Sequence, residues 1–562
     1  DRRGWAYYTE ETFDLFYPGY GDSWPSLRGG VGMTYEQAGG GEAGLAVRRS
    51  DGRILTLAER IDRHRVASLA TIDTACRNRR GMLADFHRFR KASLAAPSPG
   101  ETRAWLLPPG EDPSTTTHLV ATLVRQGVEV RRATSAFYLE RVRDASGTER
   151  APAVFEAGTW IVPAAQPVGT LARSLLEPKP RIPEAKFYDI SAWSLPYSFG
   201  VEAFQATTDP EVAADAVTEP PRAEGKVEGG PARYAYLVPW PQRGGPRLLY
   251  RLLAEGFRGR ATVEPFRIGA TEYRPGTAIF LTGDNPSSLH ARMATIAADC
   301  GVRVAAVDGG RTASGIDLGS EETIRLSRPR IAILSSDDVD ANSLGTIRFL
   351  LEVEHEIDFR LVGPEILDSR RLGDFDVLII ADGSWDAEEA KPRLDRWIED
   401  GGVVVAIEGG TSLLGVSAGE PDKDDDEKDE EKPKWVRLRE REREDDLERV
   451  PGTILAVELD PDDPLAFGLP ARIPVLKRGR QSFPLDTSGT PVGVFTGGFT
   501  LGGYIEAPAE KAISDRAWLV HQRRGEGHVV LFSDDPNFRN FWKGPSHLFL
   551  AALFFLERPP RE

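Results

Sequence analysis

The sequence predicts an α/β fold, with several parallel α/β units of the Rossmann-like or flavodoxin-like kind. Three segments support this prediction, because each runs in the order strand, helix, strand, strand and helix. They begin at Arg103, Arg233 and Arg330. The third segment contains the apolar runs IAILSS, VLIIADG and VVVAIEGG, which are typical of strands covered by helices on both faces.

Composition limits the classes of partner. The 562 residues are enough for about three or four domains. The net charge of −16 and the isoelectric point of about 5.2 argue against nucleic acid or an anionic membrane as the main partner, since both bind clustered Lys and Arg. No apolar run is long enough to span a bilayer, and His547–Leu556 is predicted to be a buried helix. Cys76 and Cys300 indicate neither a disulfide framework nor a compartment.

Changes in composition divide the chain into four predicted domains. The last of them is interrupted by a highly charged insertion, which we expect to be a solvated, disordered or partly helical loop, with partner binding as the alternative. The predicted domains cover residues 1–95, 100–205, 230–325 and 326–562, and the insertion covers residues 418–450.

One long amphipathic helix, or a helix pair, is predicted between Leu55 and Leu94. Apolar residues recur there at spacings of three to five, beginning with Leu57 and Ile61 and continuing to Phe86. This spacing is typical of a helix with one apolar face. The Pro-Ser-Pro-Gly sequence that follows predicts a linker.

The block Gly4–Gly41 is rich in aromatic residues and glycine, and it holds the residues with the clearest chemical pattern. Tyr17 is followed by the turn Gly21-Asp22-Ser23-Trp24 and then by Thr34-Tyr35-Glu36, which is predicted to end a strand. A glutamate at a strand end can take a proton from a metal-bound water, and a tyrosine can donate a hydrogen bond to a substrate. The alternatives are an exposed strand-end Glu36 and a Tyr17 that only packs, with Tyr20 as an equally placed rival.

This ordered block resembles the zinc carboxypeptidase family of carboxypeptidase A type, in the form found in long bacterial proteins. The resemblance implies that residues 1–95 are the end of a mixed-sheet domain. It implies that Glu36 is the catalytic general base and that Tyr17 binds substrate. It also implies a zinc cofactor, a peptide or protein C-terminus as substrate, and a secreted or periplasmic location, although no signal peptide is seen. The oligomeric state is left open.

The zinc ligands that this family requires are absent from the sequence. The family uses a His-x-x-Glu pair and a later histidine, all upstream of the glutamate, but none of the eight histidines precedes Glu36. A catalytic zinc needs three protein ligands. We therefore expect either a truncated metallopeptidase or a natural remnant that is inactive, and the edges exposed by a mid-domain start favour truncation.

The third α/β segment resembles class I glutamine amidotransferase-like domains, through Phe375–Gly383 and Val403–Gly410. In such enzymes the turn after the second of these strands carries a nucleophilic cysteine. Here the turn reads Glu408-Gly409-Gly410-Thr411-Ser412, without cysteine, and Ser412 has no evident partners. Ligands are expected at the carboxyl ends of the strands, near Ser335–Asp338 and Asp382–Trp385.

Two functions therefore remain at this point. The first is a zinc metallocarboxypeptidase-like hydrolase that is incomplete as this chain. The second is a non-catalytic binding or scaffold protein, with a vestigial peptidase end and an amidotransferase-like domain that lacks its nucleophile.

Overall fold

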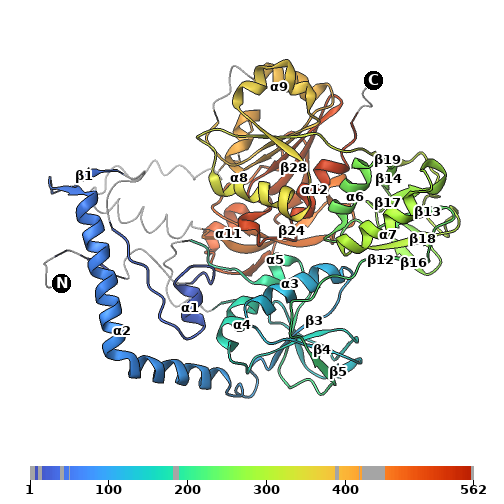
Figure 1. The fold of residues 1–562 in the computed structure, drawn as a ribbon. Coiled ribbons are helices and arrows are strands. Elements are labelled where there is room, and N and C mark those ends of the chain that lie inside the picture. The colour runs from blue at the N-terminus through green and yellow to red at the C-terminus, as the bar shows by residue number, and fades with distance from the viewer. Residues whose placement is uncertain are drawn as a thin grey trace.

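The computed structural model describes residues 5, 7–9, 16–37, 44–49, 51–180, 189–385, 391–416, 418–419 and 450–558. The described chain is a mixed α/β protein with three large sheets of seven, six and ten strands (Figure 1). Most of the predicted charged insertion lies outside the described residues. Among the helices that are described, none has the length and apolarity needed to cross a membrane.

The N-terminal region does not contain the end of a mixed-sheet domain, as far as it is described. It holds the short helix α1 (Ser23–Leu27), a two-stranded hairpin of β1 (Ala46–Arg48) and β2 (Ile54–Thr56), and the long helix α2 (Leu57–Ser93). Residues 31–37 form no strand, so the strand end predicted at Thr34–Glu36 is wrong. Helix α2 confirms the predicted amphipathic helix, but none of its residues is buried.

The first large sheet is antiparallel at every pairing, which corrects the prediction of a parallel unit. Strand β9 (Trp160–Pro163) lies between β3 (Ala104–Leu107) and β4 (Arg131–Ala133) and runs opposite to both. The other elements are α3 (Pro113–Arg125), β5 (Phe137–Leu139), β6 (Val142–Asp144), β7 (Glu149–Arg150), β8 (Ala153–Phe155), α4 (Gly169–Leu176), α5 (Leu195–Phe199), β10 (Phe204–Ala206) and β11 (Ala214–Ala216).

The second sheet also differs from the predicted parallel unit, since all its pairings except the parallel pair of β12 (Lys226–Glu228) and β18 (Arg303–Val307) are antiparallel. Strand β17 (Ala278–Leu281) is inserted between β13 (Ala235–Val238) and β14 (Gly259–Thr262), and it is antiparallel to both. Each of these two units also carries a small two-stranded sheet before its inserted strand. The remaining elements are α6 (Gly245–Ala254), β15 (Phe266–Ile268), β16 (Thr271–Tyr273), α7 (Leu289–Cys300) and β19 (Thr323–Leu326).

The third sheet has the parallel core that the sequence predicts. Five neighbouring strands are parallel, in the order β21 (Phe359–Val362), β20 (Ile331–Leu334), β22 (Val377–Ile380), β23 (Val403–Ile407) and β29 (Gly527–Phe532). An antiparallel extension follows, made of β28 (Ala517–Arg524), β26 (Thr490–Val494), β24 (Thr453–Leu459), β25 (Arg472–Lys477) and β27 (Thr500–Gly502). The helical segments include α8 (Ala341–Arg348), the π-helix η2 (Phe349–Glu354), α9 (Lys391–Glu399), the 3₁₀ turn η5 (Glu408–Leu414) and α11 (Ala507–Ile513).

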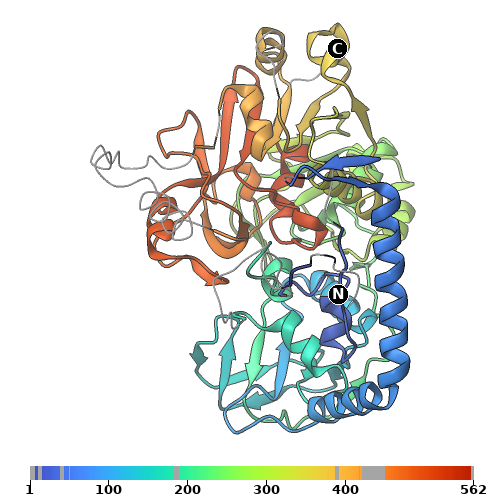
Figure 2. The same cartoon turned by 90° about the vertical axis from the view of Figure 1, so that its left-hand side faces the viewer.

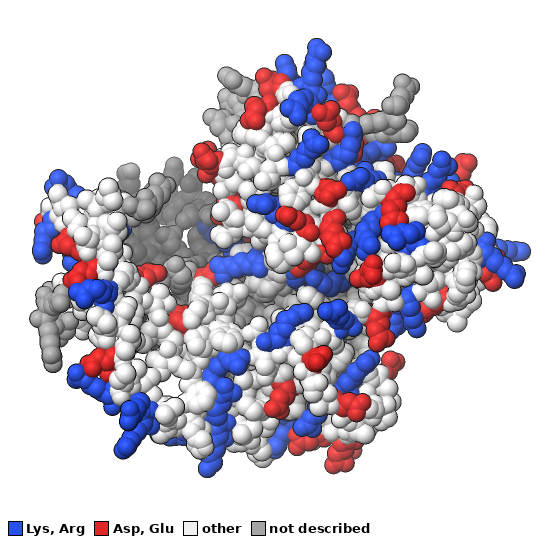
Figure 3. All heavy atoms as spheres, in the orientation of Figure 1, with Lys and Arg blue, Asp and Glu red and all other residues white. Residues whose placement is uncertain are grey.

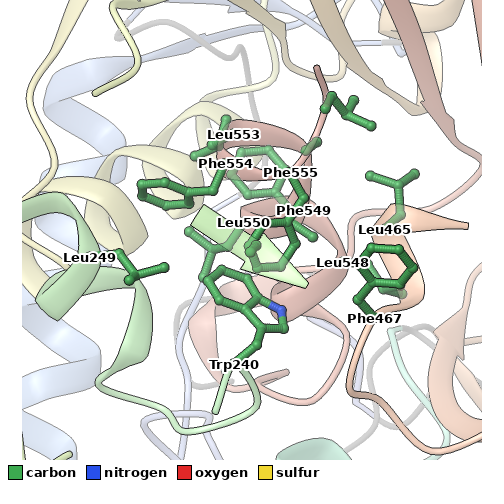
Figure 4. Close-up of a cluster of buried hydrophobic side chains, with 14 of the residues drawn as sticks. Trp240, Leu249, Leu465, Phe467, Leu548, Phe549, Leu550, Leu553, Phe554 and Phe555 are labelled. Atoms are coloured by element: carbon green, nitrogen blue, oxygen red, sulfur yellow. The ribbon is translucent and has the colours of Figure 1, made fainter. Parts of the chain in front are cut away.

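Helix α12 (Ser546–Phe554) joins the second and third units. All nine of its residues are buried, which confirms the predicted buried helix. The Trp240 ring, just after β13, meets Phe555 edge-on at a centroid distance of 4.5 Å (Figure 4). Phe467, from the third unit, also faces Phe555. The apolar contacts of α12 therefore pack parts of the chain that are far apart in sequence into one core.

A buried ionic cluster lies where the three sheet-containing units meet. Glu354, at the end of η2, pairs with Arg243 of the second unit at 3.1 Å and with Lys543 from the segment before α12. The backbone N–H of Arg243 in turn donates to Asp112, which caps α3 of the first unit. Burial pushes the pKa of Glu354 up, but Arg243 and Lys543 outweigh it and bring the pKa to about 2. The carboxylate is therefore ionised and paired inside the junction.

Candidate functional site: a carboxyl pair at the strand ends

Four carboxyl groups gather at the carboxyl ends of the parallel strands of the third sheet. Asp382 follows β22, Glu408 follows β23, and Asp534 and Asp535 follow β29. The backbone N–H of Gly409 donates to Asp382 Oδ1 at 2.9 Å. The backbone N–H of Asp535 donates to Glu408 Oε1, also at 2.9 Å. We call these four residues, together with Arg478 directly after β25, the elbow site. Ligands of open α/β sheets bind at the carboxyl ends of the strands.

Glu408 occupies a left-handed backbone conformation, with φ of 48°. This conformation is strained for a residue that is not glycine, and it is found mainly where the surrounding structure enforces it. The next two residues show how the surrounding structure constrains this backbone conformation. A Cβ added to Gly409 would lie 2.4 Å from the carbonyl oxygen of Gly383, and one on Gly410 would lie 2.7 Å from that of Ala381. The turn after β23 is therefore packed closely against the turn after β22, which constrains the backbone at Glu408.

Arg478 and Lys477 balance the negative charge of the site. Arg478 Nη2 lies 3.2 Å from Glu408 Oε2, and its guanidinium lies over the Phe538 ring at 4.8 Å. Lys477 and Asp534 form an ion pair of 2.9 Å whose side chains are 0% and 4% exposed. The two basic residues thus neutralise two of the four carboxylates.

Glu408 and Asp535 differ from ordinary carboxyl groups. Burial raises the pKa of Glu408 to about 7; Arg478 opposes this shift, and Asp534 and Asp382 add to it. Burial likewise raises the pKa of Asp535 to about 7, opposed by the backbone N–H of Asn537 and assisted by Glu408. The Glu408 side chain is still 20% exposed. At neutral pH the site can therefore both donate and accept a proton at a place that solvent reaches.

The segment Ser533–Lys543 carries further strain beside the site. Asn537 is 1% exposed, and neither atom of its side-chain amide has a hydrogen-bond partner within the described part of the chain. Arg539 and Asn540 both have positive φ, at 47° and 54°. Buried amides are nearly always hydrogen-bonded, so a buried amide without a partner lowers the stability of the folded state.

The residues predicted from the N-terminal block are not part of the elbow site. Glu36 is exposed, and its backbone oxygen accepts from the side chain of Gln37. Tyr17 packs edge-on against Tyr20 at 5.3 Å and against Trp193 at 6.4 Å, and burial raises its pKa. Within the described residues no hydrogen bond joins Tyr17 to Glu36.

The turn between these two residues has a structural role. Asp22 accepts from the backbone N–H of Ser23 and from the hydroxyl of Thr34, and it caps α1. The Trp24 indole donates to Gln126 of the first unit at 2.8 Å. The turn therefore fastens the N-terminal segment to the body.

The amidotransferase-like turn after β23 does not present an activated nucleophile. Ser412 is exposed and donates to the carbonyl of Gly409 at 2.7 Å, without a histidine or acid on its hydroxyl in the described structure. Cys300 lies at the end of α7 in another unit, where burial raises the pKa of its thiol. No group of three or more His, Cys, Asp or Glu in the described ranges could hold a metal ion.

Sequence reasoning reached two of the five residues of the elbow site. The carboxyl-end rule pointed to Asp382, which follows a strongly apolar strand. Glu408 was singled out only as part of the turn that carries a cysteine in amidotransferase-like enzymes. Sequence reasoning missed Arg478, Asp534 and Asp535. The only signal for the last two was the Asp-Asp-Pro-Asn sequence directly after another apolar run, HVVLF.

Comparisons with known proteins give only weak structural likenesses. No family model and no curated protein matches the chain. Similar solved structures include a ThuA-like protein from Bacteroides uniformis, with a TM-score of 0.26 and 14% identity over 40% of this chain and 89% of that one. A glutamine amidotransferase from Thermotoga maritima has a TM-score of 0.24 and 12% identity over 40% and 96%. A β-galactosidase from Bacillus circulans sp. alkalophilus has a TM-score of 0.22 and 10% identity over 51% and 43%.

Likenesses at these TM-scores carry no argument about what this chain does. Nothing among them points to a zinc carboxypeptidase, and the neighbours are ThuA-like, amidotransferase and glycosidase structures. The predicted family membership and the predicted carboxypeptidase activity are therefore wrong. Zinc, a peptide substrate and a secreted or periplasmic location followed only from that family and are not carried further.

Proposed function

We propose that the third unit binds a neutral, hydroxyl-rich small molecule, such as a sugar or a polyol, at the elbow site. The observation that carries the proposal is the pair Glu408 and Asp535, two adjacent carboxyl groups whose pKa values are both about 7. Near neutral pH such a pair presents a hydroxyl donor beside carboxylate acceptors. A ligand hydroxyl both donates and accepts, so it matches this arrangement.

The charge balance of the site supports a neutral ligand. Lys477 neutralises Asp534, Arg478 neutralises Glu408, and Asp535 is partly protonated near pH 7. Asp382 accepts the backbone N–H groups of Gly383 and Gly409. An anion would meet the carboxylates, and a cation would compete with Arg478. The indole of Trp385 lies beside this edge, where it donates to the carbonyl of Ala381, and such an aromatic face suits the C–H face of a sugar ring.

Calorimetric titration tests this proposal. Glucose, sucrose and sorbitol would be titrated at pH 7 into the protein, into Glu408→Ala and into Glu526→Ala. Glu526 is an exposed carboxylate at the opposite end of β29 and serves as the matched control. We expect saturable binding of at least one of the three, at least ten-fold weaker in Glu408→Ala and unchanged in the control. Absence of saturable heat with all three, or equal binding by both variants, would refute the proposal.

Acid–base catalysis at the same site is the second candidate function. The specific observation in its favour is that both carboxyl groups titrate near working pH, which is where general acids and bases are most effective. Hydrolysis of p-nitrophenyl glycosides, followed from pH 5 to pH 9, would give a bell-shaped rate profile that Asp535→Asn removes. A rate no higher than that of buffer would exclude this candidate for these substrates.

A further inference from the structure

Helix α2 is exposed or partly exposed along its length. None of its 37 residues is buried, and it runs along the outside of the molecule at a distance from the sheets (Figures 1 and 2). Its N-terminus is fixed by a capping box between Thr56 and Glu59, and near its C-terminus Arg90 donates to the carbonyl of Pro167. The C-terminal end of the helix is therefore tied to the first unit, and the hydroxyls of Tyr35 and Thr71 lie 3.0 Å apart near its middle.

One exposed side of α2 is apolar. Ile61, Leu69, Ile72 and Leu83 are 58%, 54%, 60% and 68% exposed, and Phe86 is 42% exposed. Their spacings of three, eight and eleven place these side chains on one side of a helix, which is the pattern of a face that packs against another protein element. Exposed apolar side chains gathered on one side of a helix form a candidate interaction surface.

The charge of α2 is opposite to that of the whole chain. The helix carries nine Arg and Lys against four Asp and Glu, whereas the chain has a net charge of −16. Arg65, Arg77 and Arg88 pair with aspartates one turn away. Arg79 and Arg80 form no ion pair in the described structure, and basic side chains follow the course of α2 along the left and lower edge of Figure 3.

We propose that this face of α2 docks a folded protein whose own docking surface combines apolar side chains with acidic ones. Arg79 selects this partner over a lipid bilayer, because it stands seven residues from both Ile72 and Phe86 and so lies within the apolar face. A guanidinium at that place opposes burial in hydrocarbon and suits a protein interface, where arginine is enriched. A second copy of α2 would bring like charges together, so it is disfavoured as the occupant. This surface is independent of the elbow site.

Two synthetic helical peptides test the proposal directly. Both carry leucines at helical spacing; one has glutamates on its flanks and the other has lysines. Fluorescence anisotropy would measure their binding to the wild-type protein, to Arg79→Glu and to Arg88→Glu. Arg88 is a matched control, because it is an exposed arginine of the same helix that lies away from the apolar face.

The acidic peptide is expected to bind the wild-type protein and Arg88→Glu, and to bind Arg79→Glu at least ten-fold more weakly. Ile72→Glu should weaken binding of the acidic peptide to a similar extent. The circular dichroism spectrum should be unchanged in every variant. Equal binding of the lysine peptide would overturn the proposal. Binding to phosphatidylcholine–phosphatidylserine vesicles in place of the acidic peptide, or a dimer in sedimentation that Ile72→Glu abolishes, would also overturn it and identify the membrane or a second copy as the occupant.

Discussion

At the scale of single residues, Glu408 combines two costs that proteins usually avoid. Its backbone is left-handed, and its carboxyl group is largely removed from water beside three other acids, Asp382, Asp534 and Asp535. Strain and desolvation of this kind are retained where a side chain is needed at a fixed place. Arg478 recovers part of the cost through its ion pair with Glu408.

The stability of Glu408→Gln should depend on pH in a defined direction. The folded pKa of Glu408 is about 7, above its ordinary value of 4.5, so the folded state binds the proton more tightly than the unfolded state does. The wild-type protein therefore loses stability as pH rises from 4.5 to 7, and glutamine does not titrate. Urea unfolding should show the variant gaining about 1–3 kcal/mol relative to wild type across that window. Glu526→Gln, which is exposed, should show no trend, and a flat difference for Glu408→Gln would contradict the assigned burial.

At the scale of elements, the sequence predicted those helices and strands whose arrangement follows from a local pattern of apolar residues. Apolar runs predicted β20, β22 and β23 as a parallel core, because strands covered on both faces have a continuous apolar sequence. The antiparallel insertions of β9 and β17 were not predictable. A strand, helix, strand sequence looks the same whether its two strands are direct neighbours in the sheet or have a later strand inserted between them. The apolar spacing of α2 predicted the helix and could not reveal that none of its residues is buried.

The residues of the elbow site also differ in whether a local sequence pattern could predict them. Asp382 and Glu408 follow the strands that local pattern identified, whereas Asp535 is 127 residues beyond its hydrogen-bond partner Glu408. Arg478 is 70 residues from Glu408, on a segment whose pairing with the rest of the sheet has to be known first. Long-range register of this kind has no local signal.

Gly81→Ala should stabilise α2. Gly81 lies in the interior of the helix, and a Cβ at this position would meet nothing within 4 Å. Alanine lowers the backbone entropy lost on helix formation, which is worth about 1 kcal/mol in an exposed helix. Amide hydrogen exchange should become roughly five-fold slower in α2 and stay unchanged in β23. Gly127→Ala is the contrasting variant: its φ of 78° disfavours any Cβ, so it should destabilise the protein. Faster exchange in Gly81→Ala would show that the helix needs a flexible point there.

At the scale of the whole molecule, the junction around Glu354 determines whether the three sheet-containing units behave as one body. Glu354 contacts residues from the second unit and from the segment before α12, and Asn540 also donates to it at 3.1 Å. Removing one partner of a buried ion network leaves the others without compensation, at a cost of about 3–5 kcal/mol. The junction is therefore the place where a single substitution can separate the units.

Glu354→Gln should lower the thermal midpoint and split a single calorimetric transition into two or more. The reason is that Arg243 and Lys543 would remain buried without a counter-charge. Differential scanning calorimetry makes the measurement, with Glu352→Gln as the control. Glu352 lies on the same π-helix, but its side chain is 62% exposed and 3.9 Å from Arg348, so its removal should change little. A Glu354→Gln protein that melts like wild type would show that the units are held by apolar packing alone.

The burial of α12 also affects how the protein is made. Trp240 is synthesised long before Phe555, the ring it packs against in the shared core. At about 5–20 residues per second, an interval of roughly 15–60 s separates the two events on the ribosome. During that time the second unit has its own sheet but an uncovered indole and the apolar side chains around it. We therefore expect this apolar surface to stay uncovered during translation, and we predict that cells short of chaperones accumulate the protein in aggregates.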